Sequence, residues 1–402
     1  MSTTSLLYHA FGIAGYHLVN SEYENGVIKF RIQDNRIYRC SECKSRDVIK
    51  RGTRTRCFRA MSIGKKPVFV ELPIQRVECI TCGSIRQVDV AFADERRSYT
   101  KAFERYVLEL SRFTTMYDVA RHLGVSWDTV KDIQMRNLER KYSHIKLKDL
   151  KQIAIDEISI GKGHQYLTIV LDLGTGAIVF TNEGKGSEAL DPFWNKLKHS
   201  TAKIEAVAMD MSPAYAIAVR KNLPDAVIVF DHFHIIKMFN EKLSELRRDI
   251  QNEAVTMKQK QVIKGTRWLL LKASENLSDK HKEKLEEALD LNKPLAIAYY
   301  MKEDLRQLWS QYNKQAASLF LDNWIARARS SGIRKLMDFS KTLAVHRFGI
   351  LAWYDFQIST GPLEGTNNKI KTLIKTAYGY RDKEFLKLKL YALHEAKFKL
   401  VG

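Results

Sequence analysis

The chain has 402 residues, too many for one ordinary hydrophobic core, so two or three domains are expected. Its hydrophobic content of 45% is typical of a folded protein, its apolar runs are too short to cross a bilayer, and residues 1–5 do not begin a secretory signal. The net charge of +20 predicts a polyanionic partner such as nucleic acid, although a generally basic proteome or a ribosomal environment would give the same charge.

The first 92 residues contain all five cysteines. Residues 1–35 predict only a small N-terminal element. Within residues 36–92, Cys40 and Cys43 form one C-x-x-C pair, and Cys79 and Cys82 form a second. Two such pairs can hold one Zn²⁺ in a tetrahedron, whereas a disulfide framework conflicts with an intracellular location and a redox site needs only one pair. We therefore predict a zinc ribbon, with Cys57 as a spare or core thiol.

Residues 96–145 have the pattern of a helix-turn-helix. Apolar residues recur at helical spacing from 103 to 110, Thr115 starts a helix over 116–123, and Gly124 ends it. Ser126 can then cap a second, basic helix over 126–138, which in this motif enters the major groove of DNA. Any helical hairpin can imitate this pattern. The side chains expected to contact bases or phosphates are those of Trp127, Asp128, Thr129, Lys131 and Gln134.

Residues 150–235 alternate between apolar strands and helices. Strands are predicted over 151–160, 164–173, 177–182, 203–210 and 226–230, and helices over 188–199 and 213–222. Three hairpin-linked strands followed by helix, strand, helix and strand is the element order of an α/β ribonuclease H-like fold. The first and fourth strands are neighbours in that fold.

Residues 236–345 are helical in pattern almost throughout and predict an all-helical insertion. We expect its three tryptophans, Trp268, Trp309 and Trp324, to lie in its core, and base stacking is the less favoured alternative. Residues 346–402 would complete the ribonuclease H-like domain.

Three carboxylates lie where a metal site would need them. Asp156 is near the end of the first strand, Asp210 ends the fourth, and Glu364 opens a basic helix. A carboxylate against apolar strands needs charge compensation, and Mg²⁺ binds one or two carboxylates together with substrate phosphates. The pattern therefore indicates metal-dependent chemistry on nucleic acid. The alternative is two strand-end turn residues and one acid favoured by a helix dipole.

The order of these domains, together with several short motifs, resembles the ISL3 family of bacterial insertion-sequence transposases. The resemblance spans about residues 36–395. Its most specific pieces are Ile155-Asp156-Glu157, Met209-Asp210-Met211-Ser212, Phe230-Asp231-His232-Phe233-His234, Gly361-Pro362-Leu363-Glu364-Gly365-Thr366-Asn367-Asn368 and Ala377-Tyr378-Gly379-Tyr380-Arg381.

The resemblance implies a DDE recombinase whose triad is Asp156, Asp210 and Glu364, with Mg²⁺ or Mn²⁺ as cofactor. It implies double-stranded DNA partners, namely the terminal inverted repeats of the element and its target DNA. We expect a homodimer or larger assembly on DNA, because two element ends must be paired, and a cytoplasmic, nucleoid-associated location.

Residues beside the triad receive supporting roles. Glu157 alternates to the opposite face of the strand from Asp156, so we assign it a structural role. Asp231 and His234 are similar to a D-x-x-H signature of some DDE transposases, and support of the active site is favoured over zinc ligation. Asn367 and Asn368, one turn after Glu364, are expected to orient the Glu364 carboxylate or to contact DNA.

Two other functions fit parts of the pattern. One is a sequence-specific DNA-binding regulator with an inert ribonuclease H-like domain, but three intact acids argue against it. The other is a ribonuclease or a Holliday-junction nuclease, neither of which needs both a zinc ribbon and a helix-turn-helix.

Overall fold

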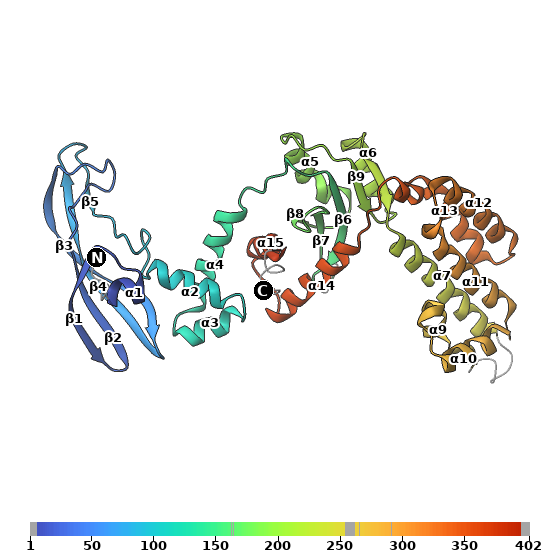
Figure 1. Cartoon of the computed structure of the whole chain (residues 1–402), viewed down its shortest axis with the longest axis horizontal. Coiled ribbons are helices and arrows are strands. Elements are labelled where there is room, and N and C mark those ends of the chain that lie inside the picture. Colours follow the sequence, from blue (N-terminus) through green and yellow to red (C-terminus); the bar gives the residue numbers. More distant parts are fainter. Residues whose placement is uncertain are drawn as a thin grey trace. The chain divides into compact units, whose positions relative to one another are not determined.

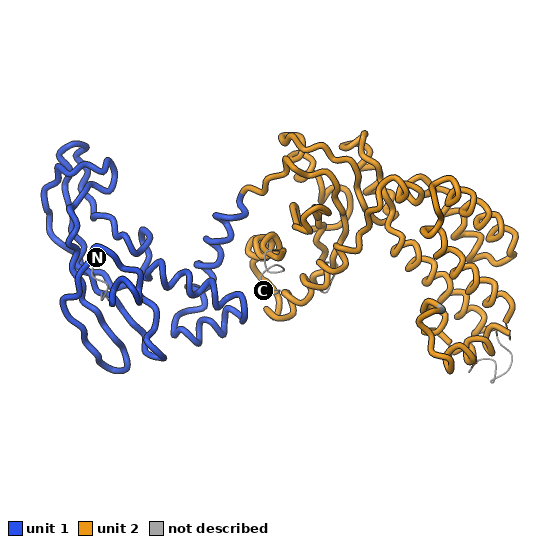
Figure 2. Tube along the Cα trace, in the orientation of Figure 1, with its two compact units in different colours: residues 1–143 blue, residues 144–402 orange. Residues whose placement is uncertain are grey.

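The structure, a computed structural model, describes residues 6–161, 163, 165–253, 262–264, 266–290 and 292–394. The chain divides into two compact units, Met1–Ser143 and His144–Gly402 (Figure 1, Figure 2). Within the described ranges, no helix is long and apolar enough to cross a membrane.

The first unit begins with α1 (Leu6–Phe11) and a five-stranded sheet. Its strands are β1 (Tyr16–Glu24), β2 (Val27–Asp34), β3 (Val48–Ile63), β4 (Lys66–Cys79) and β5 (Ile85–Gln87). The order is β1-β2-β4-β3, with β5 also paired to β4. Residues 16–34 therefore form a hairpin whose second strand runs parallel to β4 and extends the sheet.

Three helices follow the sheet: α2 (Lys101–Leu110), α3 (Met116–Leu123) and α4 (Trp127–Tyr142). The hydroxyls of Thr115 and Ser126 cap α3 and α4, and Gly124 adopts the left-handed conformation (φ 63°) that ends α3. These local signals confirm the predicted boundaries at 116–123 and the start of the second helix.

Arg59 on β3 joins the sheet to these helices. Its side chain is buried, and its guanidinium donates hydrogen bonds to the carbonyls of Ala60, Val68 and Leu123. It also lies over the rings of Phe69 and Phe103. The sheet and the helix-turn-helix are therefore packed together within the first unit.

The second unit is built on a mixed sheet of five strands. These are β6 (Gln152–Ser159), β7 (Tyr166–Asp172), β8 (Ile178–Glu183), β9 (Ala206–Met209) and β10 (Val227–Phe230), in the order β10-β9-β6-β7-β8. β6, β7 and β8 are antiparallel, whereas β9 and β10 run parallel to β6. The first and fourth strands of this unit are therefore neighbours, as the sequence predicted.

The two faces of this sheet have different partners. One face carries Ile153, Ile155 and Val207, and its core includes residues of α5 (Asp191–Lys198) and α6 (Pro213–Asn222). The opposite face carries Ala154 and Ala208 and packs against α14 (Gly361–Thr376) and α15 (Lys383–Tyr391). Residues of the strands alternate between these two cores, as the period of a β-strand requires.

Between β10 and α14 the described chain is helical. Its helices are α7 (His232–Glu253), α9 (Arg267–Leu271), α10 (Asp279–Asp290), α11 (Lys293–Arg306), α12 (Lys314–Ser330) and α13 (Arg334–Leu351). Short 3₁₀ turns are η1 (Ser187–Leu190), η2 (Ser274–Asn276), η3 (Gln307–Ser310) and η4 (Ala352–Tyr354).

The tryptophans of this helical region do not share one environment. Trp324 is fully buried, and its indole N–H donates to the carbonyl of Met301. Trp309 is partly buried, but Trp268 is 65% exposed. The prediction that all three lie in the core was therefore wrong for Trp268, because α9 is only five residues long and its apolar contacts are made by Leu269 and Leu270.

Candidate active site and metal-binding cluster

The four paired cysteines converge at one end of the β3–β4 hairpin. Their sulfurs all lie within 4.8 Å of one another, with Cys40 Sγ 3.7 Å from Cys82 Sγ and Cys43 Sγ 3.4 Å from Cys79 Sγ. The hairpin explains the long spacing, because Val48 at the start of β3 pairs with Cys79 at the end of β4. The cluster has the donor set and separation of a four-cysteine metal site.

The two halves of the cluster are built alike. The Lys44 N–H donates to the Cys40 carbonyl at 3.1 Å, and the Gly83 N–H donates to the Cys79 carbonyl at 2.9 Å. Both donor residues have positive φ, 61° and 71°. The tight turn aims both thiols of each pair at a common point. Cys57 lies on β3, exposed and outside the cluster, so it is not a core thiol.

Ser84 prepares two of these thiols for metal binding. Its hydroxyl lies 3.3 Å from Cys40 Sγ and 3.2 Å from Cys82 Sγ. This hydrogen bonding lowers the pKa of Cys40 to about 6 and lowers the pKa of Cys82 as well. Since the thiolate is the metal ligand, the lowered pKa values favour the ligating form at Cys40 and Cys82. At Cys43, by contrast, hydrogen bonding to Cys79 and burial raise the pKa to about 12.

The predicted DNA-contacting residues of α4 have unequal exposure. Trp127 is exposed with the Lys131 ammonium above its ring, and Thr129 is half-buried with its hydroxyl bonded to Ser126. Gln134, however, is only 4% exposed. Its position one turn after Val130 puts it on the buried stripe of the helix, where it is less accessible to DNA than Trp127.

Asp156 and Asp210 lie level with each other on the same face of the second sheet. The parallel register of β6 and β9 pairs Ala154 with Ala208, and each aspartate stands two residues further along its own chain. Hydrogen-bonded strands are about 4.8 Å apart. Asp156 accepts from the Glu157 N–H at 2.7 Å, and Asp210 accepts from the Ser212 N–H at 3.1 Å.

The helix α14 covers this point and brings in the distant part of the chain. Asn367 Nδ2 donates to Asp156 Oδ2 at 2.8 Å, across 211 residues of sequence. Glu364 lies three residues earlier on α14, in its first turn, and therefore shares the helix face with Asn367. Its side chain is exposed, whereas Leu363 and Ile370 anchor the helix in the core.

Asp231 forms a hydrogen bond with the residue that precedes α14. It is 2% exposed and accepts a hydrogen bond of 2.5 Å from the hydroxyl of Thr360, the residue immediately before the helix. His232 Nδ1 and His234 Nε2 lie 3.6 Å and 4.0 Å from its two oxygens. Asp231 therefore acts on the helix that carries Glu364 and Asn367.

The electrostatics around Asp156 and Asp210 favour a cation bound beside their two carboxylates. Burial raises the pKa of both Asp156 and Asp210, and the charge of Asp210 raises that of Asp156 further. Coulombic interaction with His234 lowers both pKa values, and that with Lys237 lowers the pKa of Asp210. Two half-buried carboxylates with raised pKa values fit a divalent cation, because its charge would offset both burial and mutual repulsion.

The three predicted acids do not form as tight a group as the cysteines. Within the described residues, the cysteine cluster is the one set of three or more Cys, His, Asp or Glu side chains close enough to share an ion. Three carboxylates without a cation between them repel one another, which favours a looser arrangement than that of the cysteines.

Glu157 belongs to the other face of the sheet, as its alternation predicted. Its carboxylate accepts hydrogen bonds from the Tyr215 hydroxyl at 2.5 Å and from the Gly186 N–H at 3.0 Å. Burial and the bond to Glu157 together raise the pKa of Tyr215 above its ordinary value. This network ties β6 to α6 behind Asp156.

Sequence reasoning missed Thr360, Tyr215 and Lys237 as neighbours of the site. Thr360 lies just before the predicted helix and could have been singled out as a capping residue. No local pattern marks Tyr215 or Lys237, because their relation to the acids depends on how α6 and α7 pack.

Comparison with known proteins gives matches over most of the chain. Residues 153–390 match a family model described as "Transposase", residues 88–136 the helix-turn-helix domain of transposase family ISL3, and residues 38–82 the zinc-finger of transposase IS204/IS1001/IS1096/IS1165.

Individual relatives agree. The transposase for insertion sequence element IS1001 of Bordetella parapertussis is 30% identical over 356 residues, covering 88% of both chains. That for IS1557 of Mycobacterium tuberculosis is 29% identical over 375 residues, covering 87% of this chain and 84% of the relative. Among solved structures, the Drosophila P element transposase strand transfer complex aligns over 66% of this chain and 81% of its own, with a TM-score of 0.36 and 12% identity.

Proposed function

Because the chain belongs to the ISL3 family of insertion-sequence transposases, we propose that Asp156, Asp210 and Glu364 are the metal-binding acids of its active site. Membership of this DDE family implies DNA cleavage and strand transfer that depend on a divalent metal. The helix-turn-helix and zinc ribbon are the family's accompanying domains.

The observation that carries the assignment of residues is the hydrogen bond between Asn367 and Asp156. It links the helix of the third acid to the strand of the first, while the β6–β9 register aligns the first with the second. These two observations support the proposal that three acids far apart in sequence act at one corner of the sheet. The alternative, three unrelated turn and helix-start residues, would require no such link.

The three acids would bind the metal, and the residues around them would orient the acids without taking part in the reaction. Asp156 and Asp210 would be the principal ligands, and Glu364 would approach from α14. When bound, Mg²⁺ or Mn²⁺ would activate the attacking oxygen and stabilise the leaving one. Asn367 and the Glu157 N–H orient Asp156, while Asp231, through Thr360, sets the first turn of α14. Asn367 and Asp231 are therefore positioning residues.

We further propose that residues 150–235 and 346–402 form a single ribonuclease H-like domain interrupted by the helical residues 236–345. Three antiparallel strands joined to two parallel ones, in the order β10-β9-β6-β7-β8, support this reading. The packing of α14 and α15 on the sheet supports the return of the chain to the domain after the insertion.

The DNA-binding assignment rests on the first unit. The start of α4, where Trp127 is exposed and Thr129 and Lys131 are half-buried, would contact the terminal inverted repeats. The four-cysteine cluster would hold a structural Zn²⁺. A homodimer or larger assembly on DNA would pair the two element ends.

A cleavage assay on labelled element-end DNA tests the proposed site. With Mg²⁺, the single changes Asp156→Ala, Asp210→Ala and Glu364→Ala should each abolish strand cleavage while end binding persists. Asp225→Ala, an exposed acid before β10, is the matched control and should cleave normally. Retained cleavage in any of the three would remove that acid from the site, and cleavage by none of the proteins, wild type included, would favour a regulator.

A further inference from the structure

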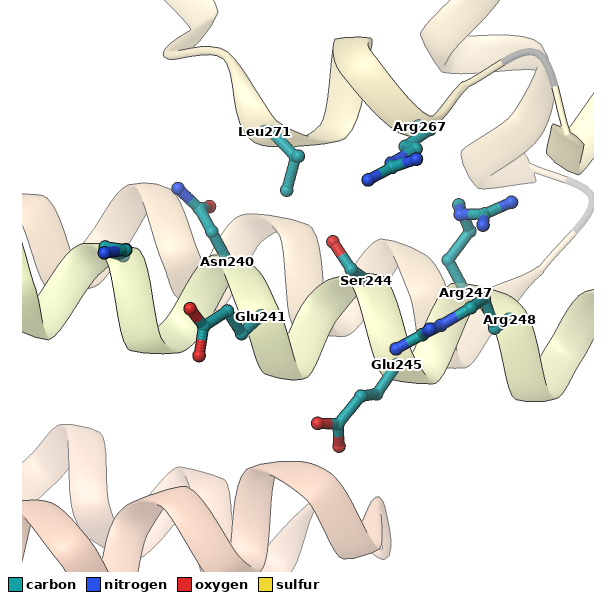
Figure 3. Close-up of a pocket in the computed structure, with 9 residues that line it drawn as sticks. Asn240, Glu241, Ser244, Glu245, Arg247, Arg248, Arg267 and Leu271 are labelled. Carbon is teal, nitrogen blue, oxygen red and sulfur yellow. The ribbon is translucent and has the colours of Figure 1, made fainter. Parts of the chain in front are cut away.

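A basic pocket lies in the helical region, and Asp156, Asp210 and Glu364 are not among its lining residues. It has a volume of about 590 Å³ and is lined by α7 and α9 (Figure 3). Arg267 on α9 faces α7, which contributes Arg247 and Arg248 (Figure 3). Lys237 and Ser244 on α7 also line it.

Arg247 is the unusual member of this group, because it is buried and has no counter-ion among the residues that the structure describes. Its side chain is 7% exposed, and its Nε has no hydrogen-bond partner. One terminal nitrogen donates to Gln251 at 2.7 Å, a neutral acceptor. Burial lowers the pKa of Arg247, and the charges of Arg267 and Arg248 lower it further. A buried guanidinium beside two others is unfavourable unless an anion is held among them.

The acids that line the pocket do not supply this anion. Glu245 is paired with Lys335 at 2.9 Å and Lys242 at 3.3 Å. Glu241 is the second lining acid, one helical turn from Lys237 and nearly two from Arg247. Within the described residues, none of the three arginines forms an ion pair. Guanidinium groups match the oxygens of phosphate bidentately, so phosphate is the anion that fits.

The helix α7 connects the pocket to the catalytic corner. It starts directly after Asp231, and Lys237, at its second turn, acts electrostatically on Asp210. Arg248 lies eleven residues beyond Lys237, which is ~16 Å along a helix.

We propose that Arg247, Arg248 and Arg267 form a binding site for a DNA backbone phosphate. That the bound phosphate belongs to substrate DNA rests on the proposed function. Trp268 supports a nucleic acid over a free anion, because it is 65% exposed beside this site and stacks with Arg267 at 4.9 Å. The helical insertion would thus be a second DNA-holding surface besides the helix-turn-helix.

The test compares Arg248→Gln/Arg267→Gln with Arg334→Gln in the full chain. Arg248 and Arg267, the two arginines that are replaced, are exposed, so the double variant should fold. An unchanged melting temperature verifies this. Arg334 is a matched control on the same helical region, with its side chain 93% exposed and outside the pocket. Affinity for a fluorescein-labelled duplex is measured by anisotropy over a range of salt concentrations, in buffer without divalent cations, so that a catalytic failure cannot affect the result.

Loss of one phosphate contact should make the slope of log affinity against log salt shallower by about 0.9 in the double variant, with the control unchanged. Equal slopes in the double variant and the wild type would overturn the proposal. Calorimetric titration with inorganic phosphate tests the alternative that the pocket binds a free phosphate ion rather than a DNA phosphate. If the double change abolishes phosphate binding yet leaves the DNA slope intact, the pocket serves a free anion and the DNA assignment is wrong.

Discussion

Replacing Asn367 by alanine should weaken metal binding at the active site without unfolding the chain. The side chain is half-buried, and its amide donates to Asp156 Oδ2 at 2.8 Å, within the range of hydrogen bonds to charged acceptors. Such a bond contributes about 1.5–3 kcal/mol. If Asp156 is a metal ligand, losing the donor that orients it should lower metal affinity roughly 10- to 100-fold.

The assay is strand cleavage as a function of Mg²⁺ concentration. The half-saturating concentration in Asn367→Ala should rise by that same roughly 10- to 100-fold factor, and cleavage at saturating Mg²⁺ should recover most of the wild-type rate. The bond to Asn367 lowers the pKa of Asp156, so its loss raises that pKa. The acidic limb of the pH–rate profile should therefore move to higher pH.

Asn368→Ala is the matched control, because Asn368 is the next residue on α14 and is exposed. Its Mg²⁺ dependence should equal that of the wild type. The reasoning is refuted if Asn367→Ala has the wild-type half-saturating concentration and pH limb, even if its maximal rate is lower. In that event Asn367 would act on DNA rather than on Asp156.

Three further predictions follow from the two proposed metal sites and from α4. Cys40→Ser/Cys79→Ser should lose about one zinc per chain by elemental analysis, whereas Cys57→Ser, exposed on β3, should keep it; equal zinc in all would exclude the cluster. Burial raises the pKa of Asp210 in the folded chain above its value in the unfolded chain. The contribution of Asp210 to stability is therefore fully present below the unfolded pKa and is lost as pH rises through the folded pKa. Asp210→Asn should therefore melt at a higher temperature than the wild type at neutral pH without metal, and the difference should vanish in acid; no difference at neutral pH would contradict this. Lys131→Ala should reduce the salt dependence of DNA binding by about 0.9 in slope if its ammonium contacts a phosphate, and an unchanged slope would exclude that contact.

The sequence alone determined the features that depend on short-range chemistry. A hydroxyl can accept from the backbone N–H three residues later and so cap a helix, and on this basis Thr115 and Ser126 marked the starts of α3 and α4. A C-x-x-C turn prepares two thiols for one ion by itself, and the apolar strands and their order predicted the neighbouring positions of β6 and β9. The side of the strand on which Glu157 lies also followed from alternation alone.

Tertiary structure decided which side chains are free to act. The helical spacing of α4 did not reveal that Gln134 would lie on its buried stripe, because that depends on how α4 packs against α2 and α3. The hydrogen bonds of Asp231 to Thr360 and of Asn367 to Asp156 span 129 and 211 residues, beyond any local pattern. The arginine pocket likewise exists only because α9 folds back on α7, which brings Arg267 to Arg247. Contacts of this kind arise from long-range packing, whose partners a sequence pattern does not specify.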